Sequence, residues 1–491
     1  MSYDIIIIGS GAGGSATAFH LTQTGKRVLL LEKGQALPKD GSTLDVEKVF
    51  GRKLFVDDAP WLDAAGRVIV PQERSNLGGK TKWYGAALLR FAPHEFDAEP
   101  DHQCLPWPFG YDELAPFYEE AERLFGVRHF EIEPDLQQIV TGLRRRDGGW
   151  QRRPLPMALA GDILSYPEEA KHFDGFASVR GLKADGERLV ERVLGKPNLQ
   201  VLTGKNVAAL LPSARNARRV TGVQCDDGTR YDADVVVLSG GALHSPRLLQ
   251  DYFEQNGLAV LPAYRAIGRN YKFHLLTAML AFSPRAKSDV LRKTTLLLHD
   301  ELPHSSVQPL GYTDGELFAT EAPGYFPAWL SDYVGSRVYG FFLQTEDGSH
   351  PDNRILARAN GTGRPQIDYD ARRLPAALAE HRRLRNTLAR GLLSLGYLPL
   401  IKSVPVAGTA HACGTLVAGN DPDTSVVDAR GRVHGIENLF VADGSVLPRS
   451  SRANPALSIY AWGLRLASHL GGQGGAAGER ARNATMTTHH E

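Results

Sequence analysis

The chain has 491 residues, 42% of them hydrophobic and 23% charged, an ordinary globular composition whose length predicts roughly two or three structural units. A formal net charge of +1 gives no electrostatic reason to expect a nucleic acid partner. Cys104, Cys225 and Cys413 are far apart in the sequence, so we expect neither a metal site nor a disulfide framework. A strand pattern begins almost at once and no apolar run reaches membrane-spanning length, so we expect a cytoplasmic protein without signal peptide or membrane span.

The N-terminal segment predicts a nucleotide-binding βαβ unit. A β-branched apolar run leads into Gly9, Gly11 and Gly14 at G-x-G-x-x-G spacing, and a helix pattern and a second apolar strand follow, ending on Glu32. In such a unit the glycines allow a tight turn, close approach of backbone to a pyrophosphate, and packing of helix on strand. The helix N-terminus offers N–H groups to phosphates. Glu32 stands where a carboxylate accepts hydrogen bonds from a ribose 2′-hydroxyl, which favours FAD or NAD over NADP.

Two later stretches carry sheet patterns. Residues 198–239 predict a β unit whose last strand leads through Gly240 into a helix that opens at Ser245. Residues 265–373 are mainly β, and an amphipathic helix pattern follows at 376–396. This inserted β segment has a composition that suits a substrate domain.

Two segments combine glycines with polar residues. In SNLGGKTKWYGAALLRF, residues 75–91, the glycines either let backbone lie against a flat ligand or form a turn before a buried element. In residues 410–466 a short apolar strand ends on Asp-Gly-Ser, and an Asn-Pro pair precedes an apolar helix. Taken singly, His411 is compatible with a satisfied loop histidine and Asn454 with a helix cap.

Together these blocks strongly resemble the glucose–methanol–choline (GMC) family of FAD-dependent oxidoreductases, and within it the bacterial sugar and alcohol dehydrogenases. In chain order they are GSGAGG with Glu32, NLGGKTKWYG, GGALHSPRLL, IGRN with a following histidine, PDNRI, HACGT, NLFVADGSVLP and NPALSI. Only residues 130–195 and the C-terminal tail lack recognisable motifs.

The resemblance implies an α/β fold with a doubly wound, Rossmann-like FAD-binding domain and a mainly antiparallel β-sheet substrate domain. The FAD-binding domain would be assembled from residues 1–100, 196–264 and 405–470. The substrate or cap region would comprise residues 101–195 and 265–404. Residues 471–491 are polar and Gly-rich and are expected to form a disordered tail.

The resemblance also implies roles for particular residues. His411 would be the catalytic histidine that accepts the hydroxyl proton, and Asn454 would hold the hydroxyl oxygen beside it. His434 is expected to be structural or on the surface, and no metal is expected. The residues expected to contact FAD are Gly9, Gly11, Ala12, Gly13, Gly14, Glu32, Lys33, Gly78, Gly79, Trp83, Val207, Gly240, Asp443, Gly444, Asn454 and Pro455.

The chain departs from many members of that family after the glycine pair. A histidine that can link covalently to the flavin is replaced by the run KTKWY at 80–84, so we expect non-covalent FAD. The expected reaction is oxidation of a CH–OH group of an alcohol, sugar or polyol, with hydride transfer to flavin N5. The electron acceptor (oxygen, a quinone or a redox protein), the substrate and the oligomeric state are left open. One alternative is a non-redox lyase on the same fold. The other is a non-catalytic nucleotide-binding module, which the presence of both His411 and Asn454 disfavours.

Overall fold

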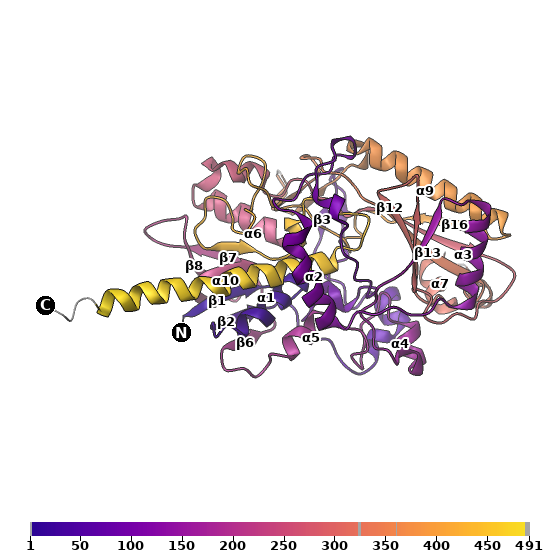
Figure 1. Cartoon of the computed structure of the whole chain (residues 1–491), viewed down its shortest axis with the longest axis horizontal. Helices are drawn as coiled ribbons and strands as arrows, with labels where there is room; N and C mark the ends of the chain where they lie inside the picture. Colours follow the sequence, from indigo (N-terminus) through magenta and orange to yellow (C-terminus); the bar gives the residue numbers. More distant parts are fainter. Residues whose placement is uncertain (1, 323–325, 360, 487–491) are drawn as a thin grey trace.

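A computed structural model of the chain describes residues 2–322, 326–359 and 361–486. Within these residues the strands form three sheets, of seven, six and four strands. The seven-stranded sheet lies at one end of the molecule and the six-stranded sheet at the other (Figure 1). The expected combination of a doubly wound sheet with an antiparallel substrate-domain sheet is confirmed; the segment boundaries proposed above stay a prediction.

The seven-stranded sheet has the order β6-β2-β1-β9-β8-β7, with β17 also paired to β9. β1 lies between β2 and β9 and is parallel to both, and its residues from Ile5 to Ile8 are buried. Burial on both faces is what the continuous β-branched run predicts for a central parallel strand. The strands of this seven-stranded sheet are β1 (Tyr3–Ile8), β2 (Val28–Leu31), β6 (Leu199–Leu202), β7 (Val207–Pro212), β8 (Val220–Cys225), β9 (Arg230–Leu238) and β17 (Leu439–Val441).

Helix α1 (Ala12–Thr22) follows the glycine turn and packs against α10 (Ala456–Met486), which runs along it (Figure 1). The two backbones approach so closely that a Cβ on Gly463 would lie 2.6 Å from the Gly13 carbonyl oxygen. A Cβ on Gly13 would lie 1.6 Å from the Ala442 carbonyl oxygen, just after β17. The N-terminal turn is therefore enclosed by residues from the C-terminal part of the chain.

The six-stranded sheet is antiparallel and has the order β16-β10-β13-β12-β11-β5. Helices α3 (Pro134–Arg146) and α9 (Pro375–Ser394) share a buried core with it, in which Leu388 of α9 and Phe341 of β13 take part. This confirms the amphipathic helix expected at 376–396. The strands of this antiparallel sheet are β5 (Trp150–Pro154), β10 (Leu275–Phe282), β11 (Thr295–His299), β12 (Ser305–Pro309), β13 (Val338–Thr345) and β16 (Leu398–Ser403).

A small sheet joins distant segments in the order β14-β15-β3-β4. Its strands are β3 (Trp61–Leu62), β4 (Val68–Ile69), β14 (Arg354–Leu356) and β15 (Gln366–Asp368). The remaining α-helices are α2 (Tyr111–Phe125), α4 (Pro167–Lys171), α5 (Gly186–Glu191), α6 (Gly241–Gln255), α7 (Gly315–Glu321) and α8 (Ala328–Gly335). No helix in the described part of the chain is both long and apolar enough to cross a membrane.

Two expectations differ from the structure. Helix α6 begins at Gly241 and not at Ser245, because the Asp443 carboxylate accepts hydrogen bonds from both the Gly241 N–H and the Ser245 hydroxyl and so holds the first turn. The chain from 471 was expected to be disordered, whereas the structure continues α10 to Met486. An established helix extends one residue at a time at little cost, and the Ala, Glu and Arg residues of this stretch favour the helix although its glycines do not. Residues 487–491 lie outside the described residues.

Candidate active site

A cavity of about 800 Å³ lies where the parallel strands of the large sheet end. Its lining includes the residues that follow β1, β2, β9 and β17, among them Gly9, Glu32 and Asp443. Phe342 of β13 and Leu310, next to β12, line it from the antiparallel sheet. The cavity therefore opens at the carboxyl edge of the parallel strands, where α/β sheets bind ligands, and meets the second sheet there.

All the site residues expected from the sequence line this cavity except Gly14 and Gly78. Gly14 packs behind the turn, where a Cβ would lie 2.0 Å from the Gly9 carbonyl oxygen. Gly78 has a φ of +86° and donates its N–H to the Ser10 hydroxyl at 2.9 Å. Gly14 and Gly78 therefore pack behind the residues that line the cavity. The residues that line it are Gly9, Gly11, Ala12, Gly13, Glu32, Lys33, Gly79, Trp83, Val207, Gly240, His411, Asp443, Gly444, Asn454 and Pro455.

The N-terminus of α1 presents open backbone to the cavity. A Cβ on Gly11 would meet no atom within 4 Å, so the space in front of this residue is free for a ligand. Two cationic side chains in the lining also have buried nitrogens without a hydrogen-bond partner among the described residues, Arg74 Nη1 and Arg247 Nε. Burial lowers the pKa of Arg74 to about 10, so it keeps its charge at neutral pH. A long ligand with anionic phosphates, such as FAD, fits this combination.

The Glu32 carboxylate is largely occupied by its own loop. It accepts hydrogen bonds from the Ser10 N–H at 3.0 Å, the Ser10 hydroxyl at 2.6 Å and the Gly34 N–H at 2.9 Å. The side chain is 6% exposed, and burial raises the pKa of the carboxyl. A carboxylate has about four acceptor positions. Roughly one therefore remains for a ribose hydroxyl, and Glu32 shapes the glycine turn as well as facing the cavity.

Asp443 holds the neighbouring turns together. One carboxylate oxygen accepts from the Gly241 N–H and the Ser245 hydroxyl, and the other accepts from the Ser445 N–H and hydroxyl. Burial raises the pKa of this carboxyl. With four donors already bound, the carboxylate orients backbone groups around the cavity.

His411 and Asn454 face each other in the cavity, close to the antiparallel sheet. The Asn454 amide nitrogen lies 3.4 Å from His411 Nε2, and its carbonyl oxygen accepts a short hydrogen bond from the Gln308 amide of β12. Burial is the main cause that lowers the pKa of His411 well below the usual histidine value, and the nearby charges of Lys293 and Lys80 act in the same direction. The imidazole is therefore neutral at neutral pH and can accept a proton. His434 does not line the cavity and contacts the Gly419 carbonyl and the Ser425 hydroxyl instead.

Other residues of this end of the cavity had no role assigned from the sequence. Lys293 Nζ lies 2.8 Å from the Asp174 carboxylate, and both side chains line the cavity. Gly85 leaves the room they occupy, since a Cβ there would lie 2.4 Å from Asp174 Oδ1. Residues 119 positions apart give no spacing signal, so the sequence held no sign of the pair. Gln308 and His274 were also missed, although the IGRN block leads up to His274.

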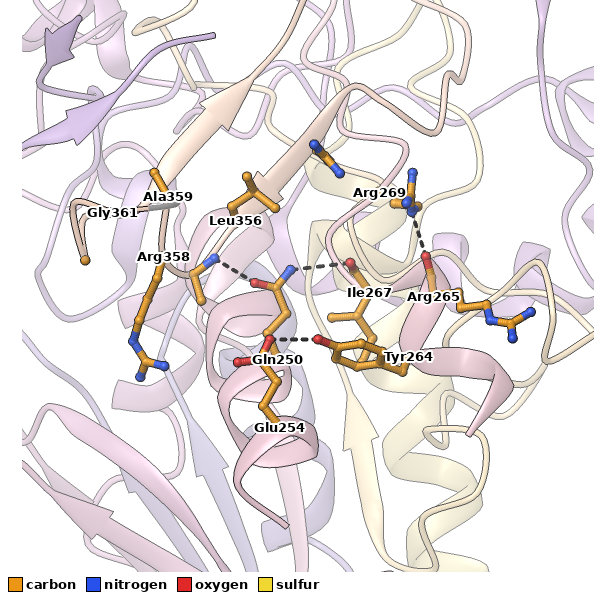
Figure 2. Close-up of a pocket in the computed structure, with 13 residues that line it drawn as sticks. Gln250, Glu254, Tyr264, Arg265, Ile267, Arg269, Leu356, Arg358, Ala359 and Gly361 are labelled. Atoms are coloured by element: carbon orange, nitrogen blue, oxygen red, sulfur yellow. Dashed lines mark hydrogen bonds between the residues drawn. The ribbon is translucent and has the colours of Figure 1, made fainter. Parts of the chain in front are cut away.

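A second cavity, of about 770 Å³, lies beside α6 and β14 (Figure 2). Gln250 bridges its floor by bonding the Ile267 carbonyl and the Ala357 N–H. Arg358 and Arg269, which line it, pair with aspartates, and the labelled guanidinium groups point in different directions (Figure 2). Charges that are paired and divergent do not converge on one ligand, so this cavity is not a candidate active site.

Comparison with known proteins identifies the class of this fold and site. A model of FAD-dependent oxidoreductases matches residues 4–268, more than half of the chain, and a model of GMC oxidoreductases matches residues 349–463. The protein is thus an FAD-dependent oxidoreductase. More particularly, its C-terminal part matches the GMC oxidoreductases, and its curated relatives include GMC-type oxidoreductases.

Two curated relatives match over more than nine-tenths of their length. The 6'''-hydroxyparomomycin C oxidase of Streptomyces lividus is 29% identical over 95% of this chain and 92% of the relative. The paromamine 6'-oxidase of Streptomyces fradiae is 27% identical over 96% of this chain and 91% of the relative. Among solved structures, pyridoxine 4-oxidase from Mesorbium loti superposes with a TM-score of 0.67 at 22% identity, covering 95% of this chain and 99% of that one. This last similarity concerns the fold.

Proposed function

We propose that the protein oxidises a CH–OH group of a polar alcohol, sugar or polyol, using His411 as the proton acceptor and Asn454 as the anchor of the hydroxyl oxygen. The observation that carries the proposal is the pairing of His411 Nε2 with the Asn454 amide nitrogen at 3.4 Å. An alcohol group both donates and accepts one hydrogen bond here, so an acceptor nitrogen beside an amide donor is its complement.

The depressed pKa of His411 suits the role of proton acceptor. Because its pKa lies below the usual range, the neutral form persists from neutral pH down into mildly acidic solution. Asn454 carries no charge and cannot compete for the proton, and its link to Gln308 keeps its N–H directed toward His411. FAD, when bound, supplies the acceptor for the hydride that leaves the carbinol carbon.

The polar end of the cavity supports a substrate with several polar groups. The Lys293–Asp174 pair offers both donors and acceptors in the lining that also contains His411. A purely apolar substrate would leave the remaining hydrogen-bonding positions of this pair without partners, which is costly. The two Streptomyces relatives are named as oxidases of paromamine and a hydroxyparomomycin, which agrees with a polar substrate.

We also propose that FAD is held without a covalent bond. The segment beside the cavity from Gly79 to Gly85 contains lysines, Thr81, Trp83 and Tyr84 but no histidine. Trp83 donates its indole N–H to the Asn76 amide oxygen at 2.9 Å and lies under the Arg74 guanidinium, so it is occupied within the wall.

Anaerobic mixing of the FAD-loaded protein with a panel of sugars, polyols and simple alcohols tests the function. A substrate should bleach the oxidised flavin absorption, and readmitted air then reveals whether oxygen restores it. A lyase would convert its substrate without bleaching the flavin. Product formation with the flavin still oxidised would refute the proposal, as would failure of every hydroxylated compound to bleach it.

A further inference from the structure

We infer that His274 is a positioning residue that selects the protonation tautomer of His411. His274 lies just before β10 and is fully buried, and its Nδ1 is 3.1 Å from His411 Nδ1. This role rests on the proposed function, because it explains how His411 is held in the tautomer that can accept a proton from the substrate. The hydrogen bonds of each ring determine which nitrogen carries the proton.

The proton of His274 is located by its other nitrogen. His274 Nε2 lies 2.7 Å from the Ser451 carbonyl oxygen, which can only accept a hydrogen bond. Nε2 must therefore carry the hydrogen. A neutral imidazole has one N–H, so Nδ1 of His274 is left with a lone pair facing His411.

The His411 ring has to carry its hydrogen on Nδ1, the nitrogen that faces His274. Two ring nitrogens 3.1 Å apart hydrogen-bond only if one of them carries a hydrogen, so His411 Nδ1 is the donor. The lone pair of His411 Nε2 is then directed into the cavity. The Asn454 side leads to the same result independently: its oxygen is taken by Gln308, so its nitrogen donates toward His411 Nε2.

The carbonyl that directs His274 is itself held by a buried network. The Ser451 N–H donates to Glu346 at 3.0 Å, and its hydroxyl donates to Glu95 at 2.6 Å. Glu346 forms a two-pronged pair with Arg449, at 2.9 and 2.7 Å, and both side chains are buried. A pair buried with both charges compensated fixes its neighbours firmly.

The backbone is unusual at both residues of the hydrogen bond between His274 and Ser451. His274 has a φ of +70° and Ser451 a φ of +64°, a region that residues other than glycine rarely occupy. Asp347 accepts hydrogen bonds from the backbone N–H groups of Phe273 and His274, at 2.8 and 3.0 Å, and so holds the first of these conformations. Strained residues that their surroundings hold in place are typical of functional sites.

The tautomer matters because the alternative form of His411 is useless as a base. With the proton on Nε2, the ring would present a donor where the substrate hydroxyl also needs to donate. Without His274 both tautomers become accessible. In metal sites, outer-shell partners that orient a histidine are worth about 10- to 100-fold in affinity or activity, and we expect an effect of the same order here.

Selective ¹⁵N labelling of histidine in the FAD-loaded protein, read by NMR, reports the tautomer directly, and the His411→Ala spectrum assigns the signals of that ring. We expect a protonated Nδ1 and an unprotonated Nε2 on His411 in the parent. A proton on Nε2 would overturn the inference, and this measurement needs neither substrate nor any change at position 274.

His274→Asn adds the kinetic side of the test. Asparagine tolerates a positive φ but is too short to make both hydrogen bonds. We expect a mixed tautomer at His411 and a limiting rate of flavin reduction lowered about 10- to 100-fold, with substrate Kd little changed. His381→Asn is the matched control, because His381 contacts Thr277 and Thr345 in the antiparallel sheet and does not line the cavity.

The outcomes separate this inference from the proposed function. An unchanged tautomer and rate in His274→Asn would overturn the inference, as would an equal loss in His381→Asn with the His411 tautomer intact. If the parent shows the Nδ1–H tautomer but no alcohol reduces its flavin, the proposed function fails while the role of His274 stands.

Discussion

Replacing His411 with alanine tests the proposed chemistry most directly. Loss of a positioned proton acceptor typically lowers a rate about 10²- to 10⁴-fold, which corresponds to about 2.7 to 5.4 kcal/mol of activation free energy. The structure adds a second, separable effect. The substitution leaves the buried His274 Nδ1 without its partner, which costs about 1–3 kcal/mol of unfolding free energy.

The assay is anaerobic flavin reduction in a stopped-flow instrument, with FAD content measured beforehand. His411→Ala should retain FAD, because the residues of the glycine turn are untouched. Burial lowers the pKa of His411, so the neutral base predominates above that value and the parent rate should fall only below the usual histidine range. The deficit of the variant should shrink as pH rises, since hydroxide and pre-ionised alcohol partly replace the base.

Two further variants serve as comparisons. Asn454→Ala should reduce the rate less and should show no rescue at high pH, because Asn454 holds geometry and accepts no proton. His434→Ala should leave flavin reduction unchanged, because the His434 ring contacts the Gly419 carbonyl and the Ser425 hydroxyl and does not line the cavity. If His434→Ala stopped flavin reduction while His411→Ala did not, the catalytic assignment would be wrong.

The remaining predictions concern the cofactor and the C-terminal helix. Acid precipitation should release yellow flavin into the supernatant, and flavin that stays on the precipitated chain would contradict non-covalent binding. Glu32→Ala should weaken FAD binding by at least about tenfold, because one charge-assisted hydrogen bond to the cofactor is worth roughly 1.5–3 kcal/mol. The substitution should also lower the free energy of unfolding, because Ser10 and Gly34 lose their hydrogen-bond acceptor. Unchanged FAD affinity would place the ribose elsewhere. Truncation after Gly472 should preserve melting temperature and activity, because the end of α10 projects beyond the body of the molecule (Figure 1), and a drop of several degrees would show that it docks.

The parts of the fold that could be predicted have local signals. The buried run of β1 and the glycine spacing after it define a strand, a turn and a helix within 22 residues, and the structure contains all three. The leucine period of α9 likewise places one face of a helix in a core. Such patterns depend on neighbours in the chain, so a sequence reveals them.

The parts that could not be predicted depend on partners brought together by folding. The small sheet pairs Leu62 with Gln366, and strands of two or three residues carry no periodicity. Glu32 was expected to serve the ribose, but its bonds to Ser10 and Gly34 are visible only once the turn is built. The contact between His274 and His411 joins residues 137 positions apart.

The enclosure of the N-terminal turn has a consequence for how the protein is made. The turn around Gly13 is synthesised long before the residues that cover it, Ala442 and Gly463. Chains emerge from the N-terminus, and contacts between distant segments form slowly. The cavity around this turn is therefore completed only after Ala442 and Gly463 have been synthesised. A chain that stops before these residues has the glycine turn without the segments that enclose it, and we expect such a chain not to retain FAD.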